Sequence, residues 1–234
     1  MERQCPYPFE VTLKEALAIQ ESIRKKISLD FPLDDAKVTF LGGVDVSYDR
    51  EGQALAAVVV LRFPSFEVVE VASGRHKPTF PYIPGFLSFR EGPAIEKAFK
   101  QLRYIPHIFF FDGQGIAHPR GVGLASHIGV LFGLVSIGVA KKPLVGHFVE
   151  PGKERGAFSW IEYQGRRVGM ALRTKYGTKP VFVSPGHQID FDRARDWVLK
   201  TSIRFRLPEP VRLAHIVSER LKEGGKEDVG SLGL

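Results

Sequence analysis

The sequence predicts an α/β fold, a single domain in which helices flank a mixed central sheet. Three observations point to it. Three β-rich runs joined by short turn-like links lie in the first third of the chain, apolar strand-like runs alternate with helical patterns in the middle, and two helical patterns close the chain. The chain has 234 residues, 44% of them hydrophobic, and no long linker. We therefore expect one domain over residues 1–222 and a flexible tail over 223–234.

The first third combines one helix with an antiparallel meander. Residues 12–29 have helical apolar spacing, and Thr12 and Glu15 have the spacing of a capping box. Strand-like runs follow at 37–48, 53–63 and 66–76. The sequence DREG between the first two of these runs suits a hairpin turn.

The remaining elements alternate between helices and strands. The apolar run HIFFFDGQG, which ends in Asp and Gly, is typical of a strand buried on both faces. The sequence FSWIEYQGRRVGMALRT predicts a hairpin about Gln164-Gly165. We expect helices at 92–103 (with Pro93 in its first turn), 123–135, 190–203 and 209–222, and further strands at 136–142 and 180–186.

Charge and cysteine content narrow the function classes. The 33 Lys and Arg exceed the 26 Asp and Glu, and the net charge of +7 favours polyanions such as nucleic acid or anionic lipid, although a basic protein without such a partner is the alternative. Cys5 is the only cysteine, which excludes an internal disulfide or a thiolate zinc site. The charged, proline-broken N-terminus and the short apolar run at 128–140 lead us to expect a cytoplasmic, monomeric protein with no membrane partner.

Three carboxylates stand where a metal site could form. Asp45 lies inside an apolar strand, Asp112 ends a buried strand, and Glu91 lies near a predicted helix start. Buried carboxylates are costly unless they are paired or bound to a cation, and oxygen ligands suit Mg²⁺ or, as a substitute, Mn²⁺. The alternatives stay open: Asp45 as a turn cap, Asp112 as a loop residue that bonds backbone amides, and Glu91 as the partner of Ser88 in a capping box.

Two loops and several basic residues are further candidates. The stretch DGQGIAHPRGVGLASH crowds glycines around His118, and it suits either a close backbone approach to a ligand or a flexible loop. Lys141 ends a buried strand and suits a phosphate contact or a solvated strand end. His127 in a helix, His187 in a predicted turn and His215 on a helix face are weaker candidates.

The sequence FPYIPGFLSFREGP predicts a stiff apolar tip directly before Glu91. Pro81 and Pro84 bracket Tyr82 and Ile83, so an aromatic and an aliphatic side chain sit on a restricted backbone.

Taken in order, six stretches resemble the motif set of the endonuclease V family over about residues 9–222. They are GGVDVSY, PYIPGFLSFREGP, FFFDGQGIAHPRGVGLASH, IGVAKKPLVG, VFVSPGH and PEPVRLAH. The resemblance implies a ribonuclease-H-like fold. It also implies a nuclease of inosine-containing DNA, with RNA as an alternative substrate, that cuts the second phosphodiester 3′ to deoxyinosine and leaves 3′-hydroxyl and 5′-phosphate ends.

The resemblance also implies roles for individual residues. Asp45, Glu91 and Asp112 match the carboxylates of the Mg²⁺ site, and Lys141 and His215 complete the catalytic set. The positions that match the base pocket are Gly85, Gly113, His118 and Gly123. The positions that match the strand wedge are Pro81, Tyr82, Ile83 and Pro84.

Two rival functions remain at this point. One is a different metal nuclease of similar fold, such as a junction resolvase or ribonuclease H, for which the PYIPG loop and the glycine-rich pocket would be unexpected. The other is an inosine-binding protein without activity, which would have no need of the set formed by Asp45, Glu91, Asp112 and Lys141.

Overall fold

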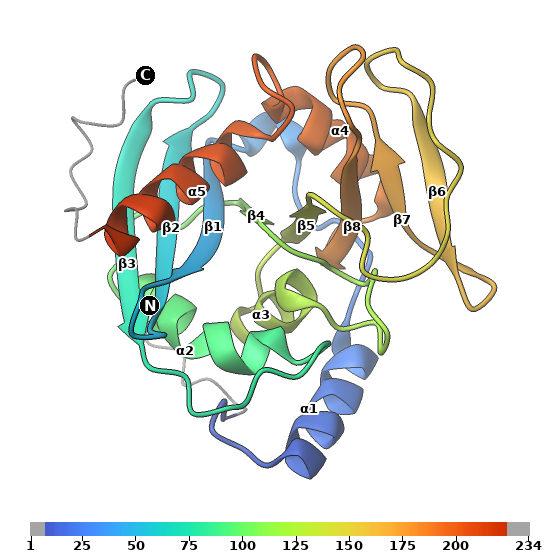
Figure 1. Cartoon of the computed structure of the whole chain (residues 1–234). Helices are drawn as coiled ribbons and strands as arrows, with labels where there is room; N and C mark the ends of the chain where they lie inside the picture. Colours follow the sequence, from blue (N-terminus) through green and yellow to red (C-terminus); the bar gives the residue numbers. More distant parts are fainter. Residues whose placement is uncertain (1–7, 224–234) are drawn as a thin grey trace.

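The structure, a computed structural model, describes residues 8–223 as one α/β domain (Figure 1). The predicted tail at 223–234 lies, apart from Glu223, outside the described residues, and so does Cys5. The helices are α1 (Leu13–Lys26), α2 (Leu87–Phe99), α3 (Leu124–Phe132), α4 (Phe191–Thr201) and α5 (Glu209–Lys222), with a short 3₁₀ turn at Asp35–Lys37. The strands are β1 (Phe40–Tyr48), β2 (Ala54–Arg62), β3 (Val68–His76), β4 (Ile108–Phe111), β5 (Ser136–Ala140), β6 (Phe158–Tyr163), β7 (Arg166–Leu172) and β8 (Val181–His187).

All eight strands form one mixed sheet in the order β3-β2-β1-β4-β5-β8-β7-β6. The predicted meander is confirmed, because β1 pairs with β2 and β2 with β3 in antiparallel fashion. β4 joins β1 and β5 as a parallel neighbour of both. The predicted hairpin is also confirmed: β6 and β7 are joined by Gln164 and Gly165, both at positive φ, as a tight two-residue turn requires.

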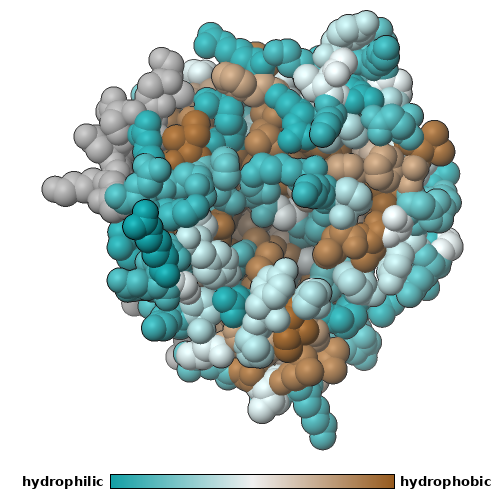
Figure 2. Space-filling model, viewed as in Figure 1, coloured by the Kyte–Doolittle hydropathy of each residue, from teal (hydrophilic) through white to brown (hydrophobic). Residues whose placement is uncertain are grey.

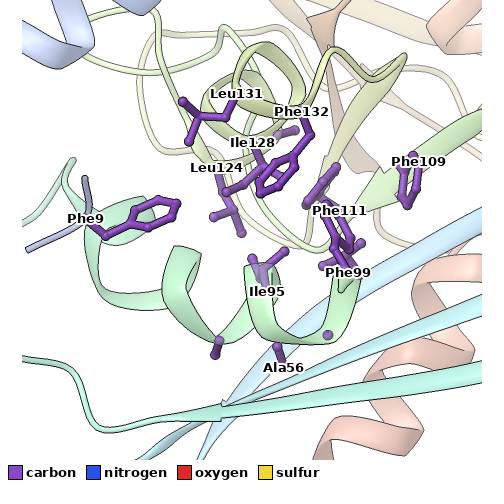
Figure 3. Packing of buried hydrophobic residues seen from close by; sticks show 14 of the residues in the cluster. Phe9, Ala56, Ile95, Phe99, Phe109, Phe111, Leu124, Ile128, Leu131 and Phe132 are labelled. Carbon is purple, nitrogen blue, oxygen red and sulfur yellow. The ribbon is translucent and has the colours of Figure 1, made fainter. Parts of the chain in front are cut away.

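Helices cover both faces of the sheet, which explains why its central strands are apolar on both sides. Along β2, Ala56 and Val58 face the cluster that contains α2 and α3, whereas Leu55 and Val59 face α5. Figure 3 shows the first of these clusters, in which Phe99, Phe109, Phe111 and Phe132 pack between the sheet, α2 and α3. This rigid two-sided core fixes the strand ends that carry the candidate site.

Two helix starts distinguish a correct local prediction from a wrong one. The capping box of α1 is confirmed, since Thr12 Oγ1 accepts from Glu15 N and Glu15 accepts from Thr12 N. The predicted start of the next helix at residue 92 is wrong: α2 begins at Leu87, so Pro93 lies inside the helix and not in its first turn. Pro93 removes one helical hydrogen bond, and the burial of Phe89, Ile95 and Phe99 on either side offsets that loss.

The capping-box alternative for Glu91 is excluded by the same helix. Phe86 is the N-cap of α2 and its start has no side-chain cap. Ser88 instead places its Oγ 2.7 Å from Nδ1 of the buried His127 on α3. Glu91 therefore lies one turn inside the helix with its side chain buried.

Candidate active site

Asp45 and Asp112 are brought together by the parallel pairing of β1 and β4. Val44 pairs with Phe111 in register, and Asp112 N donates to Val44 O at 2.9 Å, so the two aspartates are the next residues along neighbouring strands. His215 reaches the same place from α5. One ligand atom from each of the three residues lies within 4.8 Å of the others.

Two side chains of α5 hold Asp45. His215 Nδ1 lies 3.0 Å and Ser218 Oγ 2.5 Å from the same oxygen, Asp45 Oδ2. Burial raises the pKa of Asp45, but the hydrogen bonds from His215 and Ser218, together with the positive charges of His215 and Lys141, leave the pKa below its ordinary value. Asp45 is thus an ionised carboxylate fixed within a strand, and the turn-cap alternative is excluded.

The same contact determines the protonation of His215. Its hydrogen bond to Asp45 raises the pKa of His215. Because an ionised carboxylate only accepts, Nδ1 carries the hydrogen, which in the neutral ring leaves Nε2 as an acceptor. The His215 side chain is 42% exposed, so a substrate can reach it although it contacts Asp45.

Lys141 forms an ion pair with Asp112. Its Nζ lies 2.5 Å from Asp112 Oδ2, at the end of β5 beside β4. Burial and the charge of Asp45 raise the pKa of Asp112, and Lys141 offsets part of this effect. Lys141 is therefore not a freely solvated strand end, and Asp112 is bound to a side chain and not only to backbone amides.

Glu91 lies next to this group but is not a member of it. Its carboxylate is buried, and Tyr48 Oη donates to Glu91 Oε1 at 3.4 Å. Burial, followed by the charges of Asp45 and Asp112, raises the pKa of Glu91 well above its ordinary value. The charge of Asp45 thus opposes the ionisation of both Asp112 and Glu91, so acidic groups are crowded together at this site.

This donor set fits a divalent cation. The carboxylate oxygens of Asp45 and Asp112 are ligands that suit Mg²⁺ and Mn²⁺, Glu91 offers a third carboxylate next to them, and the His215 imidazole lies beside the two aspartates. A cation among them would remove the repulsion that raises the pKa of Glu91 and Asp112.

The PYIPG loop is fastened to the protein through one carbonyl group. Gly85 O accepts from Gln20 Nε2 at 2.9 Å, from His118 Nε2 at 3.0 Å and from Arg120 Nη2 at 2.5 Å. Gly85 has a φ of +82°, a backbone conformation that strains any other residue, and a Cβ there would lie 2.7 Å from Arg120 Nη2, so a substitution would also displace the Arg120 side chain. Tyr82 projects from this anchored loop with 73% of its surface exposed.

His118 connects the PYIPG loop to the loop after β4 through hydrogen bonds. Its Nε2 donates to Gly85 O, and its Nδ1 accepts from Arg120 N at 3.2 Å. Burial lowers the pKa of His118 to about 4, so the ring is neutral near pH 7. With both nitrogens occupied, His118 offers a ligand its ring and not a free polar atom.

The base-pocket candidates line one cavity of about 290 Å³, near the lower limit for a small-molecule site. Gly85, Gly113, His118 and Gly123 all lie in its wall. Tyr82, Ile83 and Pro84 lie on the loop that borders it, whereas Pro81 does not line it.

The glycine-rich stretch is ordered by close packing, which argues against a flexible loop. A Cβ at Gly115 would lie 2.0 Å from Pro185 O, and a Cβ at Gly123 would lie 2.3 Å from Gln114 O. At Gly113 the nearest atoms would be at 3.6 Å, from Leu124. Gly115 and Gly123 are therefore required by the backbone around the cavity, and Gly113 leaves space within it.

The weaker histidine candidates have structural surroundings. His127 is fully buried between aromatic rings, and burial lowers its pKa to about 3. His187 is the last residue of β8 and not part of a turn, and its Nδ1 accepts from Ser28 N at 3.2 Å. Sequence reasoning missed Ser218 and Gln20. Ser218 lies three residues after His215 and therefore on the same helix face, a spacing that could have identified it.

Between residues 8 and 223, the structure contains no helix that is both long and apolar enough to cross a bilayer. The face viewed in Figure 2 is hydrophilic over most of its area, with apolar patches toward its lower and right-hand parts.

The chain is similar to known proteins over nearly its whole length. The family model of Endonuclease V matches residues 21–216. Endonuclease V of Kosmotoga olearia is 45% identical over 224 residues, which cover 95% of this chain and 98% of that protein. Endonuclease V of Dictyoglomus turgidum is 47% identical over 208 residues, 89% of this chain and 90% of the relative.

Solved structures agree with this match. The crystal structure of the Endonuclease V from Streptomyces avermitilis superimposes with a TM-score of 0.88 at 42% identity and covers 94% of this chain and 97% of its own. Endonuclease V of Ciona intestinalis, solved with a 23mer DNA containing an inosine, has a TM-score of 0.81 at 28% identity and covers 92% and 99%. These neighbours confirm the ribonuclease-H-like fold. The chain belongs to the Endonuclease V family and is a hydrolase, a metal-dependent endonuclease of DNA repair.

Proposed function

We propose that the protein recognises deoxyinosine and cuts the second phosphodiester 3′ to it with the aid of Mg²⁺, leaving 3′-hydroxyl and 5′-phosphate ends. One observation carries this proposal. Asp112 belongs to the carboxylate group and Gly113, its neighbour in the chain, lines the base-sized cavity. Base recognition and strand cutting would therefore take place side by side, at the end of β4. The complex of the Ciona relative with inosine-containing DNA supports the choice of base.

The wall of the cavity would accept a flipped hypoxanthine and would exclude the 2-amino group of guanine. Hypoxanthine differs from guanine in lacking the 2-amino group, so a wall of backbone at Gly85 and Gly113 would admit one base and crowd the other. Backbone amides at this wall would donate to the 6-oxo oxygen. Tyr82, exposed on the anchored loop, would fill the place that the base leaves in the duplex.

Asp45, Asp112 and Glu91 would hold the cation, with His215 beside them. A divalent cation in this place supplies Lewis-acid activation of the phosphodiester and of the attacking water. His215 Nε2 accepts a proton from that water, because Nδ1–H is held by Asp45. Water would attack phosphorus, the bond from phosphorus to the 3′-oxygen would break, and the leaving 3′-oxygen would take a proton from solvent water, while the proton accepted by His215 would return to solvent. The positive charge of Lys141 would stabilise the negative charge that develops on the phosphate during cleavage.

The test uses end-labelled strands that carry one deoxyinosine, with matched strands that carry deoxyguanosine or deoxyadenosine at the same position. We expect one cut, at the second phosphodiester 3′ to inosine, that requires Mg²⁺ or Mn²⁺ and is abolished by a chelator. Equal cutting of the matched strands would contradict base recognition, and cutting in the presence of chelator would contradict the metal site. The same strands made with inosine in RNA decide between the two substrates.

The proposed partner is inosine-containing nucleic acid, the proposed location is the cytoplasm, and the proposed working state is a monomer. Sedimentation with and without an inosine strand would test the monomeric state and the binding of the strand.

A further inference from the structure

A second hollow, here called the arginine groove, meets the base cavity. It lies between the end of α1, the loop after β4 and the β6–β7 hairpin, and it has a volume of about 290 Å³. Arg24, Arg120, Arg166 and Arg167 line it, and within residues 8–223 no carboxylate does. His118 lines both this groove and the base cavity, so the two hollows are adjacent and share the His118 side chain as part of their walls.

The guanidinium groups differ in how free they are. Arg120 is occupied, because its Nε bonds to Gln20 Oε1 and its guanidinium lies 4.0 Å above the Phe86 ring. Arg167 lies 4.6 Å above the Trp160 ring, which orients its charge. Arg24 and Arg166 are exposed, and the one ion pair of Arg24 among residues 8–223 is a long contact of 3.9 Å with Glu21. Arg24 and Arg166 therefore keep most of their charge available to a ligand.

A third hollow meets the base cavity at other residues. Lys142 and Pro143 line both the base cavity and a hollow of about 380 Å³ that also contains Lys141 and Lys179. The cutting site with Lys141 and the arginine groove thus adjoin the base cavity through different walls. A strand whose base occupies the cavity would have lysines along one direction and arginines along the other.

We propose that the arginine groove holds the backbone of the damaged strand on the 5′ side of the flipped base. This inference rests on the proposed function, because a cut on the 3′ side assigns the lysine hollow to that direction and leaves the groove for the 5′ direction. Arginine without competing carboxylates is the side chain that matches phosphate. Tyr163 in the groove wall offers a ring to an unstacked base.

The experiment measures binding of single strands with one deoxyinosine by fluorescence anisotropy, in the presence of a chelator so that no strand is cut. One strand has long flanks, a second keeps one nucleotide 5′ to inosine, and a third is shortened equally on the 3′ side. The variant is Arg24→Gln with Arg166→Gln. The control is Lys37→Gln with Arg62→Gln, which changes the net charge equally at exposed residues. Arg62 is the last residue of β2. The connection from β2 to β3 lies at the top of Figure 1, whereas α1 lies at the bottom and the tip of the β6–β7 hairpin at the lower right.

We expect the variant to bind the long strand about 25-fold more weakly at 0.1 M salt, since each single-strand phosphate contact changes the salt slope by about 0.7. The slope itself should become shallower by about 1.4 for two lost contacts. The strand shortened on the 5′ side should bind the variant and the wild type alike, and the control should resemble the wild type on every strand. A loss no larger than that of the control, or a loss that persists without the 5′ flank, overturns the proposal. A fourth strand carries deoxyadenosine in place of deoxyinosine. If the wild type binds it as tightly as the inosine strand, while binding still depends on the 5′ flank and on the two arginines, the proposed base recognition is refuted and the groove remains only a site for a nucleic-acid strand.

Discussion

Replacing Ser218 with alanine should destabilise the fold by removing a hydrogen bond to a buried charge. Ser218 Oγ lies 2.5 Å from Asp45 Oδ2, and the residue has an exposed fraction of 0%. A hydrogen bond to a charged group contributes about 1.5–3 kcal/mol. For a chain of this length that corresponds to a fall in Tm of roughly 3–12 °C. Thermal unfolding followed by circular dichroism measures it directly.

The chain offers a matched control for this variant. Ser126 on α3 also has an exposed fraction of 0%, but its Oγ has no hydrogen-bond partner within the described residues. Both substitutions remove one hydroxyl from a buried helix position, so they lose the same atom and leave nearly the same cavity. We expect Ser126→Ala to be neutral or stabilising, since it removes an unsatisfied polar group. Equal destabilisation by the two variants would refute the reasoning.

The pH dependence gives a second measurement on the same pair. Asp45 has a lowered pKa in the folded state, so its contribution to stability is present above the ordinary pKa of aspartate and is lost as the pH falls through the folded pKa. The gap between wild type and Ser218→Ala should therefore be largest near pH 7. It should narrow below about pH 4, toward the 0.5–1.5 kcal/mol of a neutral hydrogen bond. A gap that widens on acidification would mean that Ser218 does not act on an ionised Asp45.

The other predictions concern the candidate catalytic residues. Asp112→Asn should abolish cleavage of an inosine strand while Tm stays within a few degrees, and cleavage at the wild-type rate would remove Asp112 from the metal site. Glu91→Gln should stabilise the metal-free protein at pH 7–8, because the raised pKa of Glu91 opposes its ionisation, and calorimetry should show weaker Mn²⁺ binding; unchanged binding would leave Glu91 a packing residue. Lys141→Ala should slow the single-turnover rate more than it weakens binding, whereas equal losses would indicate a plain phosphate anchor. Tyr82→Ala should weaken binding of an inosine duplex by about 1–3 kcal/mol and of a single strand by less, and equal losses would argue against a wedge.

Local signals in the sequence were sufficient for most elements. The capping box of α1, the meander and the turn at Gln164-Gly165 depend on residues a few positions apart, so pattern and turn chemistry determine them. The start of α2 was predicted wrongly because Pro93 was expected in the first turn of the helix, whereas the helix begins at Leu87 and contains Pro93 in its interior. The capping-box alternative for Glu91 fails for a different reason. Ser88 and Glu91 have capping-box spacing, but a contact with His127, 39 residues away, takes the serine into the core. A local rule fails where a tertiary contact offers the same side chain a buried partner.

By itself the sequence determined the α/β class, the order of the elements and the motif positions that resemble the Endonuclease V family. Only the tertiary structure decided which of those residues meet. Asp45 and Asp112 are neighbours through strand register, and His215 reaches Asp45 across 170 residues, so no spacing along the chain encodes their distance. The hydrogen bonds to Gly85 O likewise join the PYIPG loop to α1 and to the loop after β4. The arginine groove joins α1, the loop after β4 and the β6–β7 hairpin. The physical reason is that the local sequence pattern determines the secondary structure of each segment, whereas the packing of helices on both faces of the sheet determines where the polar side chains of those segments lie in space.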